Sequence, residues 1–351
     1  MRNRLFFPAH WLSLLIVYLF ALTTLGKGIK DYRSREVKLH KKPRKIASAT
    51  LASDEILWLI LQETEALHRL LAVSVFADNT QYSNIADQVK KTVPYRIGKS
   101  TENLVNAAPD LAILASFNRP DLIKKIEQIG IKTFVLPEFR KIKDIFQAIN
   151  TIGTLIHEEE AAKVVTRKFK EGIKTLSQAG KKLKEKPRVL GWAPNGTVSG
   201  CDTLFHDFVE IAGGHNVLND YSIRGWPRLS KELMLNLDPE IVVVSGNSDD
   251  RDEILKNLAK EPYTKNWSAV KQKKIVVIPA RYLSTPSPYA VNGIKKLQIE
   301  IFNFAGQPRM SQIESLPFQD TEGLWRSPNA KNLTQASESL LMGLTLDSSN
   351  S

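Results

Sequence analysis

Glu102 and Glu232 occupy the same place in a segment that the sequence repeats. Residues 101–114 read TENLVNAAPDLAIL, and residues 231–244 read KELMLNLDPEIVVV. A carboxylate can pair directionally with an arginine guanidinium of a partner. In the first turn of a helix it can instead complement the helix dipole. The repeat therefore marks two equivalent carboxylates, and both roles are open from the residues alone.

Metal binding and catalysis find little support in the remaining reactive residues. The histidines at 10, 40, 68, 157, 206 and 215 are scattered, and no pair has the spacing of a local metal site. No serine lies between glycines as in a nucleophile elbow, and no helix carries paired metal-binding histidines. The single cysteine, Cys201, cannot form an intramolecular disulfide. We therefore predict a protein that is not an enzyme and has no metal site of its own.

The elements around the first glutamate alternate between strand and helix. Each copy of the repeat reads as a short helix that a proline stops, followed by an apolar run short enough for a buried strand. Such alternation predicts a parallel sheet that helices cover on both faces. In the first half we expect a helix at 54–61 and strands at 44–48, 71–76, 111–115 and 132–136.

A second unit of the same kind follows a long helix. Residues 157–184 contain no proline, and their apolar positions recur at spacings of three and four, which is typical of one amphipathic helix. After it, strands are expected at 187–192, 241–244 and 274–278, with helices between them. The sequence predicts an α/β fold of two Rossmann-like lobes with mainly parallel sheets, 44–156 and 187–306, joined by one backbone helix at 157–186.

The two ends of the chain differ from this body. Met1 to Arg4 is basic and Leu5 to Gly26 is uncharged, an order typical of a secretory signal. The uncharged run is also long enough for a permanent anchor. We expect an exported protein with a signal at 1–26, an exposed basic arm at 27–43 and a disordered polar tail at 307–351. The formal net charge is +12, but no nucleic-acid motif accompanies it, so we expect no nucleic-acid partner.

Several short motifs follow one another along the chain. They are RKIAS at 44–48, DEIL at 54–57, LAVS at 71–74, PDL at 109–111, GIK at 130–132, AGGHNV at 212–217 and PEI at 239–241. In their order and spacing, these motifs resemble the periplasmic substrate-binding proteins of ABC importers for ferric siderophores, cobalamin and haem. The resemblance covers about residues 44–305 and implies two lobes on a rigid helical backbone, with the ligand in the groove between them.

The resemblance also implies roles for single residues. In this family one glutamate on each lobe pairs with arginines of the membrane permease, which favours Glu102 and Glu232 as docking residues. Aromatic faces suit a macrocycle or aromatic chelator, and arginines suit anionic oxygen ligands. The positions that correspond to ligand contacts in similar proteins are Phe76, Tyr95, Arg96, Trp192, Trp226, Arg281, Tyr282 and Tyr289.

These expectations describe a monomeric periplasmic solute-binding protein that delivers a metal chelate to an ABC permease and its ATPase. A ferric siderophore is the favoured ligand, because Arg96 and Arg281 suit a negatively charged chelate. Cobalamin and haem are the alternatives, and Tyr282 or Tyr289 could ligate a haem iron. A bilobed sensor without a transport role is a second alternative. No bound cofactor is expected apart from iron or cobalt in the transported ligand.

Overall fold

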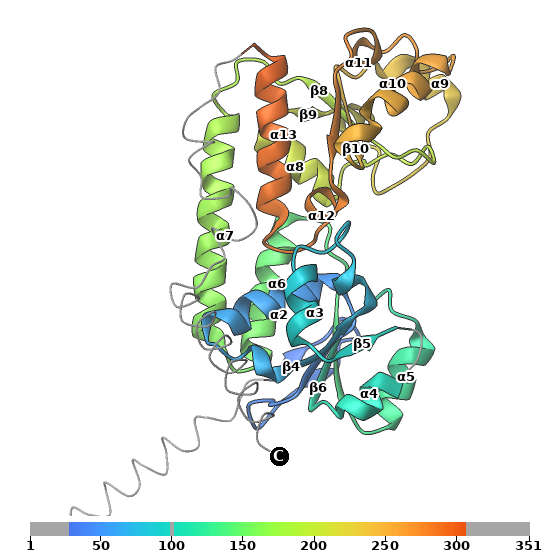
Figure 1. Ribbon diagram of the computed structural model, residues 1–351. Coiled ribbons are helices and arrows are strands. Elements are labelled where there is room, and N and C mark those ends of the chain that lie inside the picture. Colours follow the sequence, from blue (N-terminus) through green and yellow to red (C-terminus); the bar gives the residue numbers. More distant parts are fainter. Residues whose placement is uncertain (1–27, 99–101, 307–351) are drawn as a thin grey trace, which may run out of the picture.

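Two parallel sheets, each covered by helices, form two lobes that lie one above the other in the computed structural model (Figure 1). The structure describes residues 28–98 and 102–306. The expected signal at 1–26 and the expected tail at 307–351 lie outside the described residues. Among the described helices, none combines the length and apolar character needed to cross a membrane.

The first lobe contains a five-stranded sheet in the order β5-β4-β3-β6-β7, and all four pairings are parallel. Strands 111–115 and 132–136 coincide with the predicted ones, whereas the short β5 was not predicted. The strands are β3 (Ile46–Ser48), β4 (Leu70–Ser74), β5 (Tyr95–Ile97), β6 (Leu111–Ala115) and β7 (Lys132–Leu136). The helices are α2 (Leu51–Glu63), α3 (Ala86–Thr92), α4 (Glu102–Ala107) and α5 (Pro120–Gln128).

The second lobe contains a four-stranded sheet in the order β11-β10-β8-β9, again with parallel pairings. Its strands are β8 (Arg188–Trp192), β9 (His215–Asn216), β10 (Ile241–Ser245) and β11 (Ile275–Ile278). Its helices are α8 (Leu204–Ala212), α9 (Lys231–Leu237), α10 (Arg251–Lys260), α11 (Ser268–Lys271), α12 (Ala280–Leu283) and α13 (Ala290–Phe304).

The predicted backbone helix is α7 (Glu159–Gly180), which runs beside both lobes (Figure 1). It packs against α2 and α6 (Ile142–Leu155) at its start and against α8 and α13 further along. Its buried stripe includes Val165, Phe169 and Leu176. The helix is unbroken because these apolar residues recur at helical spacing and no proline interrupts them.

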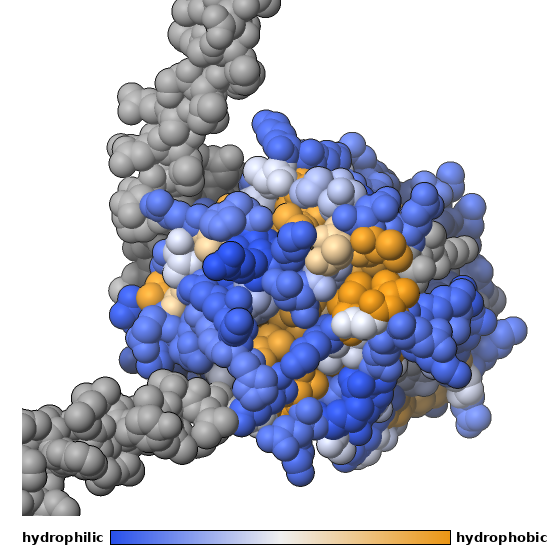
Figure 2. All heavy atoms as spheres, turned by 90° about the horizontal axis from the view of Figure 1, so that it is seen from below, coloured by the Kyte–Doolittle hydropathy of each residue, from blue (hydrophilic) through white to orange (hydrophobic). Residues whose placement is uncertain are grey.

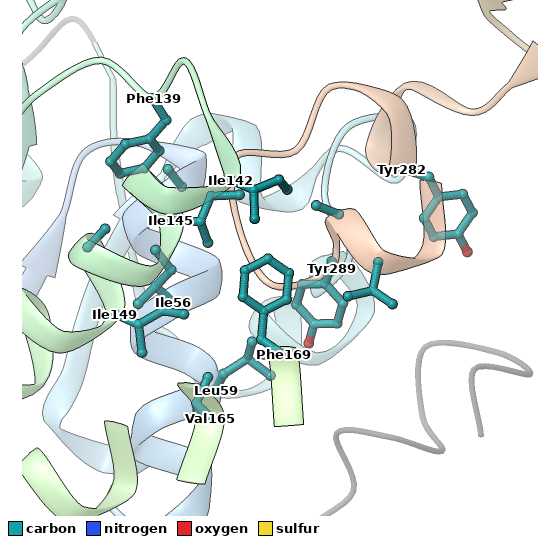
Figure 3. Close-up of a cluster of buried hydrophobic side chains, with 14 of the residues drawn as sticks. Ile56, Leu59, Phe139, Ile142, Ile145, Ile149, Val165, Phe169, Tyr282 and Tyr289 are labelled. Atoms are coloured by element: carbon teal, nitrogen blue, oxygen red, sulfur yellow. The ribbon is translucent and has the colours of Figure 1, made fainter. Parts of the chain in front are cut away.

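One apolar core continues from the first lobe through α7 into the second lobe. Figure 3 shows Ile56 of α2, Phe169 of α7 and Tyr289 at the start of α13 in a single cluster. Because both lobes bury side chains in the same core, moving one lobe against the other would expose apolar surface to water. The shared core therefore favours a fixed arrangement of the lobes.

The repeat seen in the sequence is also a repeat of backbone shape. In α4 and α9 the two glutamates are exposed, and the residues two positions later, Leu104 and Met234, are buried. Each helix ends at a residue with positive φ directly before the proline, at Ala108 (φ 39°) and Asp238 (φ 35°). Such a conformation is uncommon for a residue other than glycine, so its presence in both copies makes α4 and α9 structural equivalents.

The basic segment at the start of the described chain is not the exposed arm that its charge suggested. It forms a hairpin of β1 (Ile29–Lys30) and β2 (Glu36–Val37) on the first lobe. Asp31 is buried, and its carboxylate accepts a hydrogen bond from Arg35 Nη2 at 2.8 Å. Arg35 Nη1 also lies 2.6 Å from Glu127 Oε1 of α5. These ion pairs hold the segment against the lobe, which composition alone does not reveal.

Candidate ligand-binding site

A cavity of about 650 Å³ lies at the carboxyl edge of the first-lobe sheet. Its walls are the segments that directly follow β3, β4, β5, β6 and β7, and Ser284 and Pro286 of the second lobe close one side. Ligands of open parallel α/β sheets bind outside the carboxyl ends of the strands. The position of the cavity between the lobes makes it the candidate site.

Large apolar side chains line this cavity and remain exposed. Phe117 is 70% exposed and Phe76 is 58% exposed, and Val75 beside it is also exposed. Phe117 stands at the tip of a tight turn after β6, because Asn118 Oδ1 accepts a hydrogen bond from the backbone N–H of Ala115 at 2.7 Å. Gathered exposed apolar side chains in a concave surface indicate a binding site.

The charged side chains of the cavity balance one another. Arg119 donates to Asp121 through Nε at 3.0 Å and through Nη2 at 2.7 Å, a bidentate pair at the start of α5. Lys125 and Glu138 also line the cavity. Among the described lining residues the formal charges therefore cancel, so the cavity has no strong preference for an anion.

Below the cavity floor lies a buried carboxyl, Asp54 of α2. It accepts hydrogen bonds from Ser74 N at 3.1 Å and from Ser74 Oγ at 2.5 Å, and Ser74 itself lines the cavity. Burial raises the pKa of Asp54 to about 7, although the hydrogen bonds from Ser48 and Ser74 oppose this shift. Asp54 therefore couples the packing of α2 to the end of β4 at the floor of the site.

The neighbouring carboxyl, Glu55, connects the two lobes. Its Oε2 accepts hydrogen bonds from Thr285 Oγ1 at 2.6 Å and Ser287 Oγ at 2.5 Å, and its Oε1 accepts one from Asn84 N at 2.8 Å. Burial raises the pKa of Glu55, although the hydrogen bonds from Ser287, Thr285 and Asn84 oppose this shift. The result is a fixed position for residues 284–286, which close the cavity.

The second lobe approaches the cavity rim through charged and aromatic contacts. The guanidinium carbon of Arg140 lies 6.0 Å from the ring centroid of Trp226, which is itself exposed. Arg140 Nη1 also lies 3.3 Å from Asp202 Oδ2, and Lys141 Nζ lies 3.6 Å from Asp202 Oδ1. Because residues 140 and 141 directly follow the lining residue Phe139, these contacts place Trp226 near the mouth of the cavity.

A second hollow, of about 660 Å³, lies on the second lobe where β8 and β10 end. Trp192, Asn195 and Gly196 line it, together with residues of α10. The Trp192 ring packs edge-on against buried Trp267, with centroids 5.8 Å apart. This aromatic pair fixes Trp192 in place at the wall of the second hollow, which shares no described lining residue with the first-lobe cavity.

The structure brings only some of the predicted ligand residues to these surfaces. Phe76 lines the cavity, Trp192 lines the second hollow, and Trp226 stands at the rim. Arg96 instead pairs with Asp78, with Nε to Oδ2 at 2.6 Å and Nη2 to Oδ1 at 2.8 Å. Its neighbour Tyr95 belongs to β5 and lines neither hollow. The charge of Arg96 is thus neutralised within the first lobe.

The three predicted residues near residue 285 lie at the junction of the lobes. Arg281 donates to the carbonyl oxygens of Gln81 and Thr80, which belong to the first lobe. Tyr282 and Tyr289 are both buried, and Tyr289 is only 3% exposed. Figure 3 shows Tyr289 beside Phe169, whereas Tyr282 stands to one side of that cluster. Burial and the nearby carboxyl of Glu55 raise the pKa of Tyr289 well above its usual value. None of the three lines either hollow.

The two glutamates of the repeat stand on separate helices, and neither glutamate lines either hollow. Glu102 is exposed in the first turn of α4, and Glu232 is exposed in the first turn of α9. Each is followed three residues later by an exposed apolar side chain, Val105 (53%) and Leu235 (58%). The repeat therefore presents a carboxylate and an apolar side chain together on each lobe.

Sequence reasoning missed Phe117, Val75 and Phe139 as lining residues. The signal for Phe117 was present, because it lies two residues after the predicted strand 111–115 and ligands of open parallel α/β sheets bind outside the carboxyl ends of the strands. Among the described residues, no group of three or more side chains could hold a metal ion. The described lining of the cavity also contains no histidine, cysteine, tyrosine or methionine.

Curated relatives of this chain bind cobalamin by name. The chain is 22% identical over 270 residues to the cobalamin-binding protein of Halobacterium salinarum, covering 76% of this chain and 72% of that protein. It is 25% identical over 189 residues to the vitamin B12-binding protein of Yersinia pestis, covering 53% of this chain and 65% of that protein.

Solved structures show the same fold. A possible iron-binding periplasmic solute-binding protein of Staphylococcus epidermidis matches with a TM-score of 0.65 at 22% identity, covering 75% of this chain and all (100%) of that one. The periplasmic haem-binding protein RhuT of Roseiflexus sp. RS-1 matches with a TM-score of 0.63 at 18% identity, covering 75% and 99%. Residues 46–282 match the family described as periplasmic binding protein. The chain belongs to the periplasmic binding protein family.

Proposed function

We propose that the protein is the exported solute-binding component of an ABC importer for a metal chelate. The observation that carries this proposal is the apolar cavity at the carboxyl edge of the first sheet, with Phe76 and Phe117 exposed at its wall. Membership of the periplasmic binding protein family supports it. Aromatic walls offer wide flat contacts to a macrocycle or an aromatic chelator.

The ligand in this proposal carries a metal that is already fully coordinated. Haem iron in proteins is held by histidine, cysteine, methionine or tyrosine. The described lining residues of the first-lobe cavity include none of these, and Tyr282 and Tyr289 are buried outside it. Met234 and Tyr263 line the separate hollow on the second lobe. A haem in the first-lobe cavity would therefore lack an axial ligand from its lining, which favours a corrinoid or a ferric siderophore.

Charge favours a corrinoid over an anionic ferric siderophore. Arg119 and Lys125 are balanced by Asp121 and Glu138 in the described lining, and Arg96 is neutralised by Asp78. A site for an anionic chelate would need surplus positive charge to offset the cost of removing the anion from water. The curated relatives are named as cobalamin-binding and vitamin B12-binding proteins, which also favours a corrinoid.

A titration with three ligands tests this preference for a corrinoid over an anionic ferric siderophore and haem. Cyanocobalamin, an anionic ferric tris-catecholate siderophore and haemin are added separately to the purified full-length protein, and binding is followed by equilibrium dialysis and absorption spectra. We expect a dissociation constant for cyanocobalamin of about 1 μM or lower, and at least about tenfold weaker binding of the other two. Tight binding of haemin with a spectrum of axial ligation would contradict the proposal.

We assign permease docking to two equivalent patches. Glu102 and Val105 form one patch, and Glu232 and Leu235 form the other. Two equivalent patches on two lobes suit a partner with two equivalent sites. Charge-assisted pairing with arginines gives direction to the contact. The exposed apolar side chains would be buried against the permease at each contact, which is favourable because it removes apolar surface from water.

Uptake measurements with charge-reversed variants test the docking assignment. Glu102→Lys and Glu232→Lys should each lower uptake of labelled ligand by cells at least about tenfold, because one attractive pair becomes repulsive. Ligand affinity should be unchanged. Glu171→Lys, which reverses an exposed glutamate on α7, is the control and should leave uptake intact. If affinity falls while uptake of bound ligand persists, the glutamates belong to the groove instead.

A further inference from the structure

A third hollow, of about 1060 Å³, lies on the first lobe at the edge opposite the candidate site. Its lining residues Arg44, Arg69, Asp110 and Lys132 stand where β3, β4, β6 and β7 begin. The segment 39–43 forms the rest of its wall. Figure 2 views the molecule from the first-lobe end, where hydrophilic side chains dominate the described surface and leave only small apolar patches.

The hollow carries surplus positive charge. Lys41, Lys42, Arg44 and Lys132 line it, and Asp110 is the only acid among its described lining residues. Lys42 pairs with Glu158 at 2.8 Å, but within residues 28–98 and 102–306 no carboxylate lies within ion-pair distance of Lys41 or of the Arg44 side chain. Unpaired cations that share a concave surface attract anions with several acceptor oxygens.

The backbone of the wall is held in place by contacts that leave these side chains free. Buried Arg69 donates to the Pro43 carbonyl oxygen through Nε at 2.8 Å and Nη2 at 2.6 Å. Asp110 Oδ2 accepts hydrogen bonds from the backbone N–H of Arg44 at 2.7 Å and of Lys45 at 3.0 Å. A wall fixed in this way keeps its cations close together without a ligand, which lowers the cost of binding.

The described chain also begins beside this hollow. Ile29 pairs with Val37, and the lining residue Leu39 follows two positions after Val37. The apolar stretch from Trp11 to Phe20 precedes Gly28 by only a few residues in the sequence. Near the phosphate layer of a membrane, each lysine or arginine of the hollow would add to the attraction.

We propose that this hollow binds phosphate groups, with Lys41 and Arg44 as the principal contacts. The ligand chemistry is a phosphate-bearing anion, supplied either by the head group of an anionic phospholipid or by a free phosphate compound. The site is separate from the transport cavity and independent of what that cavity binds. Its histidines, His40 and His68, add imidazole nitrogens to the same surface.

The test compares two full-length variants with equal loss of charge. Lys41→Gln/Arg44→Gln removes two cations from the hollow, and Lys170→Gln/Lys174→Gln removes two exposed cations from α7. One arm measures binding to vesicles of phosphatidylglycerol and of phosphatidylcholine by flotation. The other measures binding of pyrophosphate by calorimetry. The uncharged segment 5–26 is the same in both proteins, so its partition into vesicles cancels in the comparison.

The lipid source is supported if Lys41→Gln/Arg44→Gln weakens binding to phosphatidylglycerol about tenfold or more while the α7 variant changes it much less. Binding to phosphatidylcholine should be equal in both variants. A similar loss confined to the pyrophosphate arm supports a free phosphate compound instead. Equal behaviour of the two variants in both arms would overturn the proposal. Unchanged thermal unfolding confirms that both variants are folded.

Discussion

Phe117 shows how a single side chain can give the candidate site its character. It is held outward by the turn after β6 and has little contact with the core. Truncation should therefore remove ligand contact and leave the fold intact. We expect Phe117→Ala to raise the dissociation constant for cyanocobalamin about 5- to 30-fold, the equivalent of roughly 1–2 kcal/mol for a lost aromatic contact.

The control for this variant is Ile129→Ala, which truncates an exposed apolar side chain after α5, outside the cavity lining. Ile129→Ala should leave the affinity unchanged. Equilibrium dialysis of both variants with cyanocobalamin gives the comparison. Equal affinities for Phe117→Ala and the unaltered protein would show that this wall does not contact the ligand.

Asp54 should make stability depend on pH in an unusual direction. Its pKa is raised from 3.8 to about 7 in the folded protein, because burial disfavours the carboxylate. The folded state therefore holds a proton that the unfolded chain releases near pH 4. The contribution of Asp54 to the free energy of unfolding is full below about pH 4 and falls as the pH rises to about 7, by on the order of 4 kcal/mol.

Asp54→Asn removes this titration. As the pH rises from 4.5 to 7.5, the free energy of unfolding of the variant should therefore increase relative to that of the unaltered protein. Urea unfolding at several pH values measures it. The adjacent Glu55 also has a raised pKa, so the variant should reduce the pH dependence without abolishing it. Asp87→Asn, an exposed change on α3, is the control. A constant difference across this range would contradict the raised pKa.

The end of α7 shows how closely two helices can depend on one glycine. A Cβ atom added at Gly180 would lie 2.5 Å from the carbonyl oxygen of Ile211 and 2.9 Å from the backbone nitrogen of Gly213. Both atoms belong to backbone at the end of α8 and cannot move aside cheaply. We expect Gly180→Ala to lower the free energy of unfolding by about 1–3 kcal/mol, despite the better helix propensity of alanine.

Urea unfolding compares Gly180→Ala with Gln178→Ala, which changes an exposed position on the same helix. Gln178→Ala should alter stability by less than about 0.5 kcal/mol. If Gly180→Ala is equally mild, the crossing of α7 and α8 is looser than the distances indicate.

Elements with a strong periodic signal were predictable, and those fixed by tertiary contacts were not. Strands β6 and β7 and helix α7 follow from apolar runs and helical spacing. Strand β5 has only three residues, Tyr95–Ile97, and no apolar run to mark it. The hairpin at β1 and β2 depends on the ion pairs of Asp31 and Arg35 with their neighbours, which no local pattern encodes.

The candidate site was likewise predictable where a local sequence signal marks it, and not where tertiary contacts decide. Its place at the carboxyl edge of the sheet follows from the order of strands and helices, and Phe76 was predicted from the resemblance to periplasmic substrate-binding proteins. Tyr289 and Tyr282 also lie near strand ends, but the packing of α13 against α7 and α12 buries them in the shared core. Burial of that kind depends on how the two lobes meet, and the sequence of one segment does not contain that information.

Four features act together to hold the lobes in one arrangement. The apolar core is continuous across them, α7 packs against both, Glu55 is bound to Thr285 and Ser287, and Arg140 pairs with Asp202. Closing the lobes around a ligand would break several of these contacts at once. The molecule should therefore bind its ligand with a preformed site and little change of shape.

Small-angle scattering tests this rigidity. The radius of gyration of the protein with and without saturating cyanocobalamin should differ by less than about 1 Å, the scale of change in preorganised complexes. Glu55→Ala removes the acceptor for Thr285 and Ser287, so it should widen the distribution of interlobe distances and weaken ligand binding, because residues 284–286 close the cavity. Glu55→Gln keeps an acceptor oxygen and should be milder in both measurements. A contraction of several ångströms on ligand addition to the unaltered protein would show that the lobes close, and that the shared core yields to ligand binding.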